Sequence, residues 1–344
     1  MEKFSQFRDR GTQIAPFLPI TPPRSTFQTA TGLLLFCLRL PIFLSLLLSY
    51  LLILQHLPIG ALLRKSILWC ILLTSGIWWI DLQVENVKKG SLSRQPKSKL
   101  PTPGSILICT STSPLDALYL SAIFDPVFTV STVGSRRVHV VGLLGAIMAA
   151  FAPPGLNTTT TSSESSAIMA TTTLAELCKK YGDTRIIAVF PEATTTNGRG
   201  VLRFAPCLDT LHGDVEIFPV SLRYSPADVT TPVPGTYGYT LFALLARPTH
   251  CIRVRIGEVL KNNSSDDRGE EFAGDSSDTV TDGLNGGGGG GEKEGMDRQS
   301  RLSERGAEAL ARIARSKRLN LGVKEKMAFV EAWSRNKRGS SSRY

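Results

Sequence analysis

The sequence predicts an α/β protein with a mixed, largely parallel sheet flanked by helices, preceded by a membrane-inserted helical hairpin. Two observations carry this prediction. From Ser105 onward, short apolar runs alternate with helix-forming segments, which is typical of strands and the helices that cover them. Before that point stand two long apolar runs, Gly32–Ile59 and Ser66–Ile80. The first contains a charge-free stretch, Leu40–Leu54.

The first apolar run is long enough to enter a bilayer. A helix needs about 20 apolar residues to cross the hydrocarbon core, and Leu33–Leu54 meets that length if the long side chain of Arg39 reaches the interface. A soluble core helix is the alternative. A cleaved signal peptide is not expected, because the run begins well inside the chain and is too long.

The second run is short for a membrane span. It contains Trp78 and Trp79, and its length is typical of a re-entrant or interfacial helix, with a buried core helix as the alternative. Basic residues flank the two runs, so the positive-inside rule favours a hairpin with both ends in the cytosol. Arg64 and Lys65 in the connecting turn favour a shallow insertion, which would also suit the phospholipid monolayer of a lipid droplet.

Composition divides the chain into five parts. Residues 1–30 are polar and are expected to form a flexible arm, and residues 31–89 form the membrane anchor. The α/β domain occupies residues 90–260, opened by a basic linker. Residues 261–298 are rich in Gly, Ser, Asp and Glu and are expected to be a disordered acidic insertion. Residues 299–344 hold basic helices and a tail.

Each element of the α/β domain follows from a local pattern. Strands are predicted where apolar and β-branched residues run together, and helices where apolar residues recur at helical spacing. In chain order we expect a strand at 105–109, a helix at 114–124, strands at 127–131 and 138–141, helices at 143–151 and 167–181, and strands at 186–190, 215–222 and 251–257. Gly182 is the expected C-cap of the helix at 167–181.

Charge and cysteine content exclude other classes. The net charge is +10, but a nucleic-acid-binding protein needs a patterned basic face with aromatic platforms, and none is evident. We therefore interpret the charge as a membrane-surface signal and expect no nucleic-acid partner. The six cysteines form no CxxC pair, which indicates buried thiols in a reducing compartment.

Two short blocks carry candidate chemistry. TSTSPLDALYL, at Thr110–Leu120, opens a predicted helix and contains Asp116. FPEATTTNGRG, at Phe190–Gly200, follows a buried strand and contains Glu192. Carboxylates near a cleft can act as a general base or can orient one.

These blocks resemble two sequence blocks of the glycerolipid acyltransferases, which acylate lysophospholipids from acyl-CoA. The first family block reads Asn-His-x-x-x-x-Asp, and here Thr110 and Ser111 stand at the Asn and His places while Asp116 keeps its own. The second reads Phe-Pro-Glu-Gly-Thr-Arg-Ser, and here Ala193 stands at the glycine and Thr195 at the arginine. The likeness is strongest to the fungal branch of lysophosphatidic acid:oleoyl-CoA acyltransferases.

The resemblance implies particular roles. The catalytic candidates are Asp116, Ser111 and Glu192, although a serine cannot be a general base at neutral pH. A third block, IFPVSLRY, resembles the family's Val-Pro-Val strand near the acyl-CoA site. The substrate-binding candidates are Pro191, Thr194, Thr195, Asn197, Gly198, Arg199, Arg203 and Pro219. The resemblance also implies acyl-CoA as co-substrate, lysophosphatidic acid or another lysophospholipid as acceptor, and neither a metal nor another cofactor.

Alternatives stay open at this point. Ser113 to Asp116 is also a capping-box pattern with Pro114 at the first helical position, so Asp116 either serves the site or caps its helix. The second block could be a plain strand-to-turn connection. The function is either acyl transfer in phospholipid and triacylglycerol synthesis, or lipid or acyl-CoA binding by a catalytically weak protein in droplet organisation or trafficking. The expected location is the endoplasmic reticulum membrane or a lipid droplet, with the domain facing the cytosol.

Overall fold

A computed structural model describes residues 2–54, 60–87, 99–155, 171–211, 215–261 and 290–341. Its strands are β1 (Ile77–Val84), β2 (Ile106–Cys109), β3 (Val127–Ser131), β4 (Arg137–Val141), β5 (Thr171–Thr173), β6 (Ile187–Phe190), β7 (Gly200–Val201), β8 (Ile217–Ser225), β9 (His250–Ile256) and β10 (Lys317–Arg318). Its α-helices are α1 (Thr26–Ser49), α2 (Ala61–Thr74), α3 (Pro114–Ile123), α4 (Leu143–Ala149), α5 (Leu174–Tyr181), α6 (Tyr237–Leu245), α7 (Gly290–Ala314) and α8 (Val323–Ser341).

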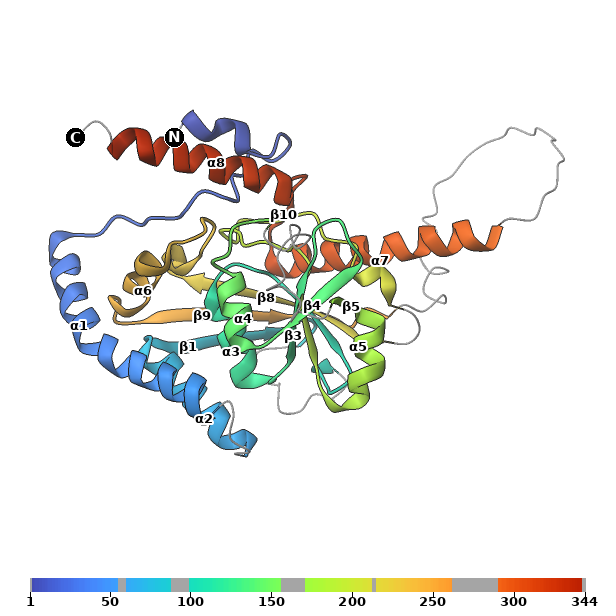
Figure 1. Cartoon of the computed structure of the whole chain (residues 1–344), viewed down its shortest axis with the longest axis horizontal. Helices are drawn as coiled ribbons and strands as arrows, with labels where there is room; N and C mark the ends of the chain where they lie inside the picture. The colour runs from blue at the N-terminus through green and yellow to red at the C-terminus, as the bar shows by residue number, and fades with distance from the viewer. Residues whose placement is uncertain are drawn as a thin grey trace, which may run out of the picture.

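The centre of the fold is a mixed sheet, which confirms the predicted fold class (Figure 1). Within the described residues it has eight strands in the order β1-β9-β8-β2-β6-β3-β4-β5. The neighbours β8, β2, β6 and β3 pair in parallel, while β9, β4 and β5 join antiparallel partners. The parallel strands are continuous apolar runs because both of their faces are covered.

Helices cover the two faces of the sheet with separate apolar clusters. Leu107 and Cys109 of β2 point into a cluster shared with α2, α3 and α4. Ile106 and Ile108 point to the opposite face, where they meet apolar side chains of α5 and α7. The alternation of side chains along the strand therefore produces two cores from one four-residue segment.

The second apolar run differs from its prediction. Its helix, α2, ends at Thr74, and Gly76 then takes a left-handed φ of +79°. The following residues form the edge strand β1, which pairs in parallel with β9, so Trp78 and Trp79 lie on a strand rather than on an interfacial helix. The physical reason is local: a left-handed glycine ends the helix, and the aromatic and β-branched residues after it favour extended backbone.

The predicted helix at 167–181 begins later than expected. Residues 167–170 lie outside the described residues, and the three threonines of β5 pair with β4. The helix α5 starts at Leu174, where Thr173 supplies the N-cap side chain, and Gly182 follows as C-cap with a φ of +46°. β-branched threonines favour the strand, and the hydroxyl of the last one favours a helix start.

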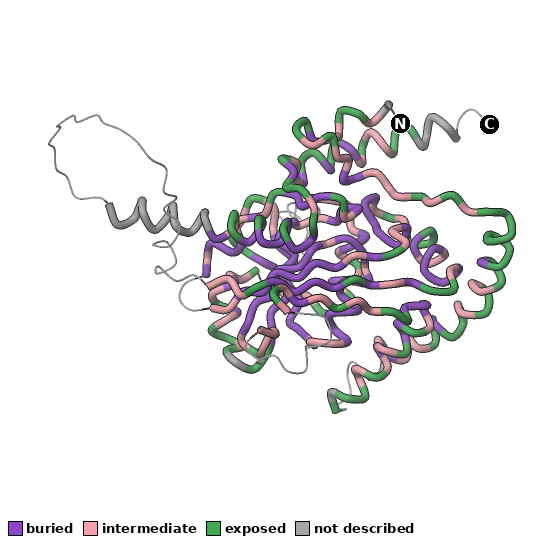
Figure 2. The backbone as a smooth tube through the Cα atoms, turned by 180° about the vertical axis from the view of Figure 1, so that it is seen from behind, coloured by how far each residue is buried: buried purple, intermediate pink, exposed green. Residues whose placement is uncertain are grey.

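The helix α1 lies along one end of the sheet, beside α2 (Figure 1). Among the described residues one helical stretch, Thr26–Leu52, is long and apolar enough to cross a membrane by length and composition. Much of its surface is exposed (Figure 2). Its inner side packs on α6 through Phe36 and Phe242, whose ring centroids are 5.4 Å apart.

The N-terminal arm is packed, which corrects the expectation of a loose segment. Its first turn, Glu2–Phe7, lies beside α8, so both chain termini are at the same end of the molecule (Figure 1). Phe17 and the rings of the first turn surround Phe329, which is fully buried. The predicted acidic insertion lies mostly outside the described residues, and α7 begins inside its range at Gly290.

Candidate active site

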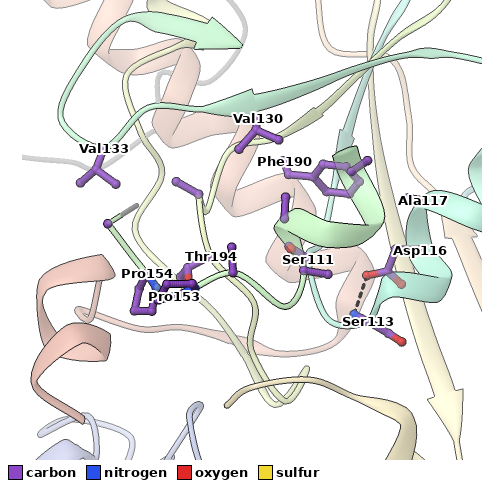
Figure 3. A pocket seen from close by; sticks show the side chains of 16 residues that line it. Ser111, Ser113, Asp116, Ala117, Val130, Val133, Pro153, Pro154, Phe190 and Thr194 are labelled. Carbon is purple, nitrogen blue, oxygen red and sulfur yellow. Dashed lines mark hydrogen bonds between the residues drawn. The ribbon is translucent and has the colours of Figure 1, made fainter. Parts of the chain in front are cut away.

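Both sequence blocks line one small cavity of about 40 Å³ (Figure 3). Ser111 and Asp116 come from the first block, at the carboxyl end of β2 and the start of α3. Phe190 and Thr194 come from the second block, at the carboxyl end of the neighbouring strand β6. The end of α4 and the segment after it complete the wall. Carboxyl ends of adjacent parallel strands are the usual place for a site in an α/β sheet.

Asp116 caps its helix and also faces the cavity. Its Oδ2 accepts hydrogen bonds from the backbone N–H groups of Thr112, at 2.7 Å, and Ser113, at 2.9 Å. The hydroxyl of Tyr224 donates to Oδ1 at 2.5 Å. Burial raises the pKa of Asp116 to about 6, against the lowering effect of these hydrogen bonds. The capping alternative is therefore confirmed, and the carboxylate stays mostly ionised at neutral pH.

Tyr224 is a site residue that the sequence reasoning missed. It ends the third block on β8 and is separated from Asp116 by 108 positions in the chain. Its side chain is buried, and burial together with the Asp116 charge raises its pKa well above the usual value. A protonated phenol is thus fixed as a donor that orients the Asp116 carboxylate. Its place in IFPVSLRY was the available signal.

Ser111 sits on the cavity wall, held by main-chain contacts. Its carbonyl oxygen accepts a hydrogen bond from the N–H of Thr196 at 3.0 Å, which joins the first block to the second. Beneath it, Thr112 accepts from the N–H of Thr231, and the Ser113 hydroxyl donates to the carbonyl of Val229. The turn that carries Ser111 is therefore held in place by these hydrogen bonds.

Glu192 lies behind the cavity wall rather than on it. It is 2% exposed, and its Oε2 accepts a long hydrogen bond of 3.4 Å from the N–H of Leu202. Burial raises the pKa of Glu192 to about 8, with a lowering contribution from the charge of Lys326 and a raising one from Asp116. The charge of Asp116 therefore reaches Glu192, and Glu192 is mostly protonated at neutral pH.

Backbone conformation explains part of the second block. Ala193 takes a left-handed φ of +52° and Gly198 one of +74°. A glycine adopts this region without a side-chain clash, and an alanine does so at a cost of about 1–2 kcal/mol. Ala193 stands where the family that this block resembles has a glycine. The backbone strain therefore arises at a residue on the wall of the cavity.

The Asn-Gly turn faces the N-terminal arm. The Asn197 side-chain amide donates to the carbonyls of Ala15 and Leu18, at 2.8 and 2.9 Å, and its backbone N–H donates to Pro16. Asn197 is buried by these contacts, and the structure does not bring it to the cavity. Gly198 uses its carbonyl as an acceptor for Arg223.

The remaining substrate-binding candidates are spread out. Thr194 is on the cavity wall and Pro191 is buried next to it. Arg199 is exposed, and the guanidinium of Arg203 bonds the side chain of Asn320. Pro219 lies in the interior strand β8 under α7, on the face opposite the cavity. Their roles in substrate binding stay predictions.

Histidines do not supply a replacement base at this cavity within the described part of the chain. His139 lies on β4, where it pairs with Val130 of the cavity wall, but His139 itself is not among the residues that line the cavity. His250 is buried with Nε2 at 2.9 Å from the carbonyl of Leu244. His56 and His212 lie outside the described residues.

A buried strand-to-helix turn with a capped aspartate therefore meets the turn of the second block at one cavity. Residues 86–223 match the family described as Acyltransferase.

Two relatives are similar to this chain. The "Putative lysophosphatidic acid:oleoyl-CoA acyltransferase" of Schizosaccharomyces pombe is 25% identical over 342 residues, which is 97% of this chain and 99% of that protein. The "Lysophosphatidic acid:oleoyl-CoA acyltransferase 1" of Saccharomyces cerevisiae is 32% identical over 207 residues, 60% of this chain and 61% of that protein. No solved structure matches the chain.

Proposed function

We propose that this protein transfers a fatty acyl group from acyl-CoA to lysophosphatidic acid, or to a related lysophospholipid, at a membrane or lipid-droplet surface. The observation that carries the proposal is the meeting of both blocks at one cavity beside the Asp116 carboxylate. The substrates named for both relatives support this donor and acceptor.

Asp116 is the proton acceptor in this proposal. The acceptor hydroxyl oxygen bonds to the thioester carbonyl carbon, the carbon–sulfur bond breaks, and CoA leaves as the thiol after its sulfur takes up the proton that Asp116 removed from the hydroxyl. Asp116 takes the hydroxyl proton while Tyr224 holds the carboxylate, and the Ser111 hydroxyl orients the acceptor. Orientation of two bound substrates can contribute about 7–11 kcal/mol, so a site with a weak base still permits turnover.

The membrane contact proposed here is an insertion into one leaflet. Arg39, halfway along α1, donates to the carbonyls of Arg247 and Pro248 at 2.6 and 3.1 Å. A helix tied at its middle to the α/β domain lies along the membrane surface more readily than across it. The exposed side chains of α1 and the exposed Trp78 and Trp79 would then meet lipid.

The test is an acyl-transfer assay with full-length protein on artificial droplets, using labelled oleoyl-CoA and lysophosphatidic acid. Asp116→Asn keeps the shape of the side chain and removes the proton acceptor, so we expect turnover to fall by about 10²–10⁴. Asp125→Asn is the matched control, because Asp125 follows the far end of α3 and forms surface ion pairs. Equal turnover in both variants would contradict the proposal.

A second candidate is a protein that binds lipid or acyl-CoA without rapid turnover. Ser111 at the family's histidine place, with no described histidine on the cavity wall, favours it. Wild-type protein that binds oleoyl-CoA and the lysolipid but gives no product above background would support this candidate over the first.

A further inference from the structure

Lys326 on α8 is a buried lysine whose ammonium contacts the second block. Its side chain is 1% exposed, and Nζ donates to the carbonyl oxygen of Thr195 at 2.6 Å and to its hydroxyl oxygen at 2.9 Å. The Thr195 hydroxyl donates a hydrogen bond to the carbonyl oxygen of Thr231 at 2.6 Å. Lysine is almost never fully buried unless it is paired, so this ammonium requires an explanation.

The titratable group that interacts with the Lys326 side chain is Glu192, which burial keeps mostly protonated at neutral pH. The charge of Lys326 lowers the pKa of Glu192, and that of Glu192 raises the pKa of Lys326, although burial brings the latter down to about 7. Asp116 is the next charged group, and it acts on Glu192 in the opposite direction. Lys326 of the C-terminal helix α8 therefore acts on the carboxyl group of the second block.

Packing alone does not account for a lysine here. The neighbours of Lys326 on the inner side of α8, such as Phe329 and the partly buried Val330, already fix the helix in an apolar cluster. Replacing a whole buried ion pair by apolar side chains of similar volume is often neutral or stabilising, so packing does not require a charge at this position. A methionine would fill the space but would leave the Thr195 carbonyl oxygen without its donor, so the ammonium serves that contact.

The contacts of Thr195 indicate what the Lys326 ammonium does. Its neighbour Thr194 is on the cavity wall, and its other neighbour, Thr196, donates a backbone hydrogen bond to Ser111. The ammonium therefore holds the peptide that joins the two blocks. Thr195 also stands where the second block of the resembling family has an arginine. The positive charge at this place therefore comes from Lys326, in another part of the chain.

We propose that Lys326 is a positioning residue of the acyl-transfer site, which fixes the Thr194–Thr196 peptide against Ser111. The inference rests on the proposed function for its kinetic part and on the described contacts for its structural part.

The experiment compares Lys326→Met with Lys324→Met, which removes the same charge from an exposed position on the same helix. We expect Lys326→Met to lower kcat at least tenfold, with an unchanged melting temperature and intact oleoyl-CoA binding. Lys326→Arg should recover part of the loss. Lys324→Met should match the wild type.

The pH profile separates positioning from general damage. Removing the Lys326 charge raises the pKa of Glu192, because a nearby cation favours the ionised carboxylate. In the pH profile of kcat, the limb that is due to Glu192 is the one that disappears in Glu192→Gln. The midpoint of this limb should therefore move to higher pH in Lys326→Met and stay unchanged in Lys324→Met. Should Lys326→Met fail to fold, Lys326→Gln keeps a donor for Thr195 and serves in its place.

Hydrogen exchange tests the structural part without activity. Amides of residues 192–202 should exchange faster in Lys326→Met than in Lys324→Met. Active wild type with identical kcat, pH profile and exchange in the two variants would overturn the inference. Wild type without turnover would instead overturn the proposed function, and the exchange comparison would still decide whether Lys326 holds the block.

Discussion

At the scale of single residues, Ala193 shows how the second block stores strain beside the cavity. Its left-handed φ of +52° costs an alanine about 1–2 kcal/mol, whereas glycine loses about 0.4–1 kcal/mol through the greater freedom of its unfolded chain. We expect Ala193→Gly to stabilise the folded protein by about 1 kcal/mol, measured as the free energy of unfolding in denaturant.

The control for this substitution is Ala328→Gly in the exposed interior of α8. There the backbone is helical, so glycine should destabilise the protein by about 1 kcal/mol. Opposite signs for the two variants would support the assigned backbone conformation. Loss of stability in both would show that Ala193 is relaxed in solution.

At the scale of elements, the N-terminal arm is fastened to the second block through Asn197. Asn197→Asp replaces an amide donor by a carboxylate that faces the carbonyls of Ala15 and Leu18. A buried group left without its partner costs about 1–3 kcal/mol. We expect the arm to detach and to be cleaved faster in limited proteolysis, before the sheet unfolds. Asn336→Asp, at an exposed position of α8, should leave the cleavage rate unchanged.

Sequence patterns predicted the elements whose signals are local. β2, α3, β3 and β6 were placed to within a residue or two because apolar runs and a capping box mark them. β1 was missed because Trp78 and Trp79 suit a strand or an interfacial helix, and pairing with β9 decides between them. Helix α6 had no expected counterpart.

The candidate site was predictable only in part for the same reason. Ser111, Asp116 and Thr194 come from blocks that are recognisable along the chain, and they share the cavity. Tyr224 and Lys326 contact those blocks from 108 and 131 positions away. The third block marked the strand that carries Tyr224 but not its contact with Asp116, and no pattern along the chain singled out Lys326.

At the scale of the whole molecule, most of the exposed large apolar side chains belong to α1, α2 and β1. Much of the backbone of α1 is coloured as exposed in Figure 2. Leu34 and Leu38 of α1 are exposed by 73% and 65%, and Trp78 and Trp79 by 67% and 71%. Apolar surface of this extent on one side of a protein marks a contact with a membrane or a partner. With a net charge of +10, an anionic phospholipid surface is the contact that we expect.

The strand β1 then makes a prediction that separates this contact from a transmembrane helix. Tryptophans prefer the membrane interface, so Trp78→Ser with Trp79→Ser should weaken binding to phosphatidylserine-containing vesicles and to droplets severalfold. Because α1 is unchanged, a protein anchored by a span would float with vesicles as the wild type does. The control pair is Tyr237→Ser with Tyr239→Ser, exposed aromatics at the start of α6. Unaltered flotation of the tryptophan variant, with resistance to alkaline extraction equal to that of the wild type, would show that α1 alone anchors the protein. The helix α1 would then cross the membrane instead of lying along its surface.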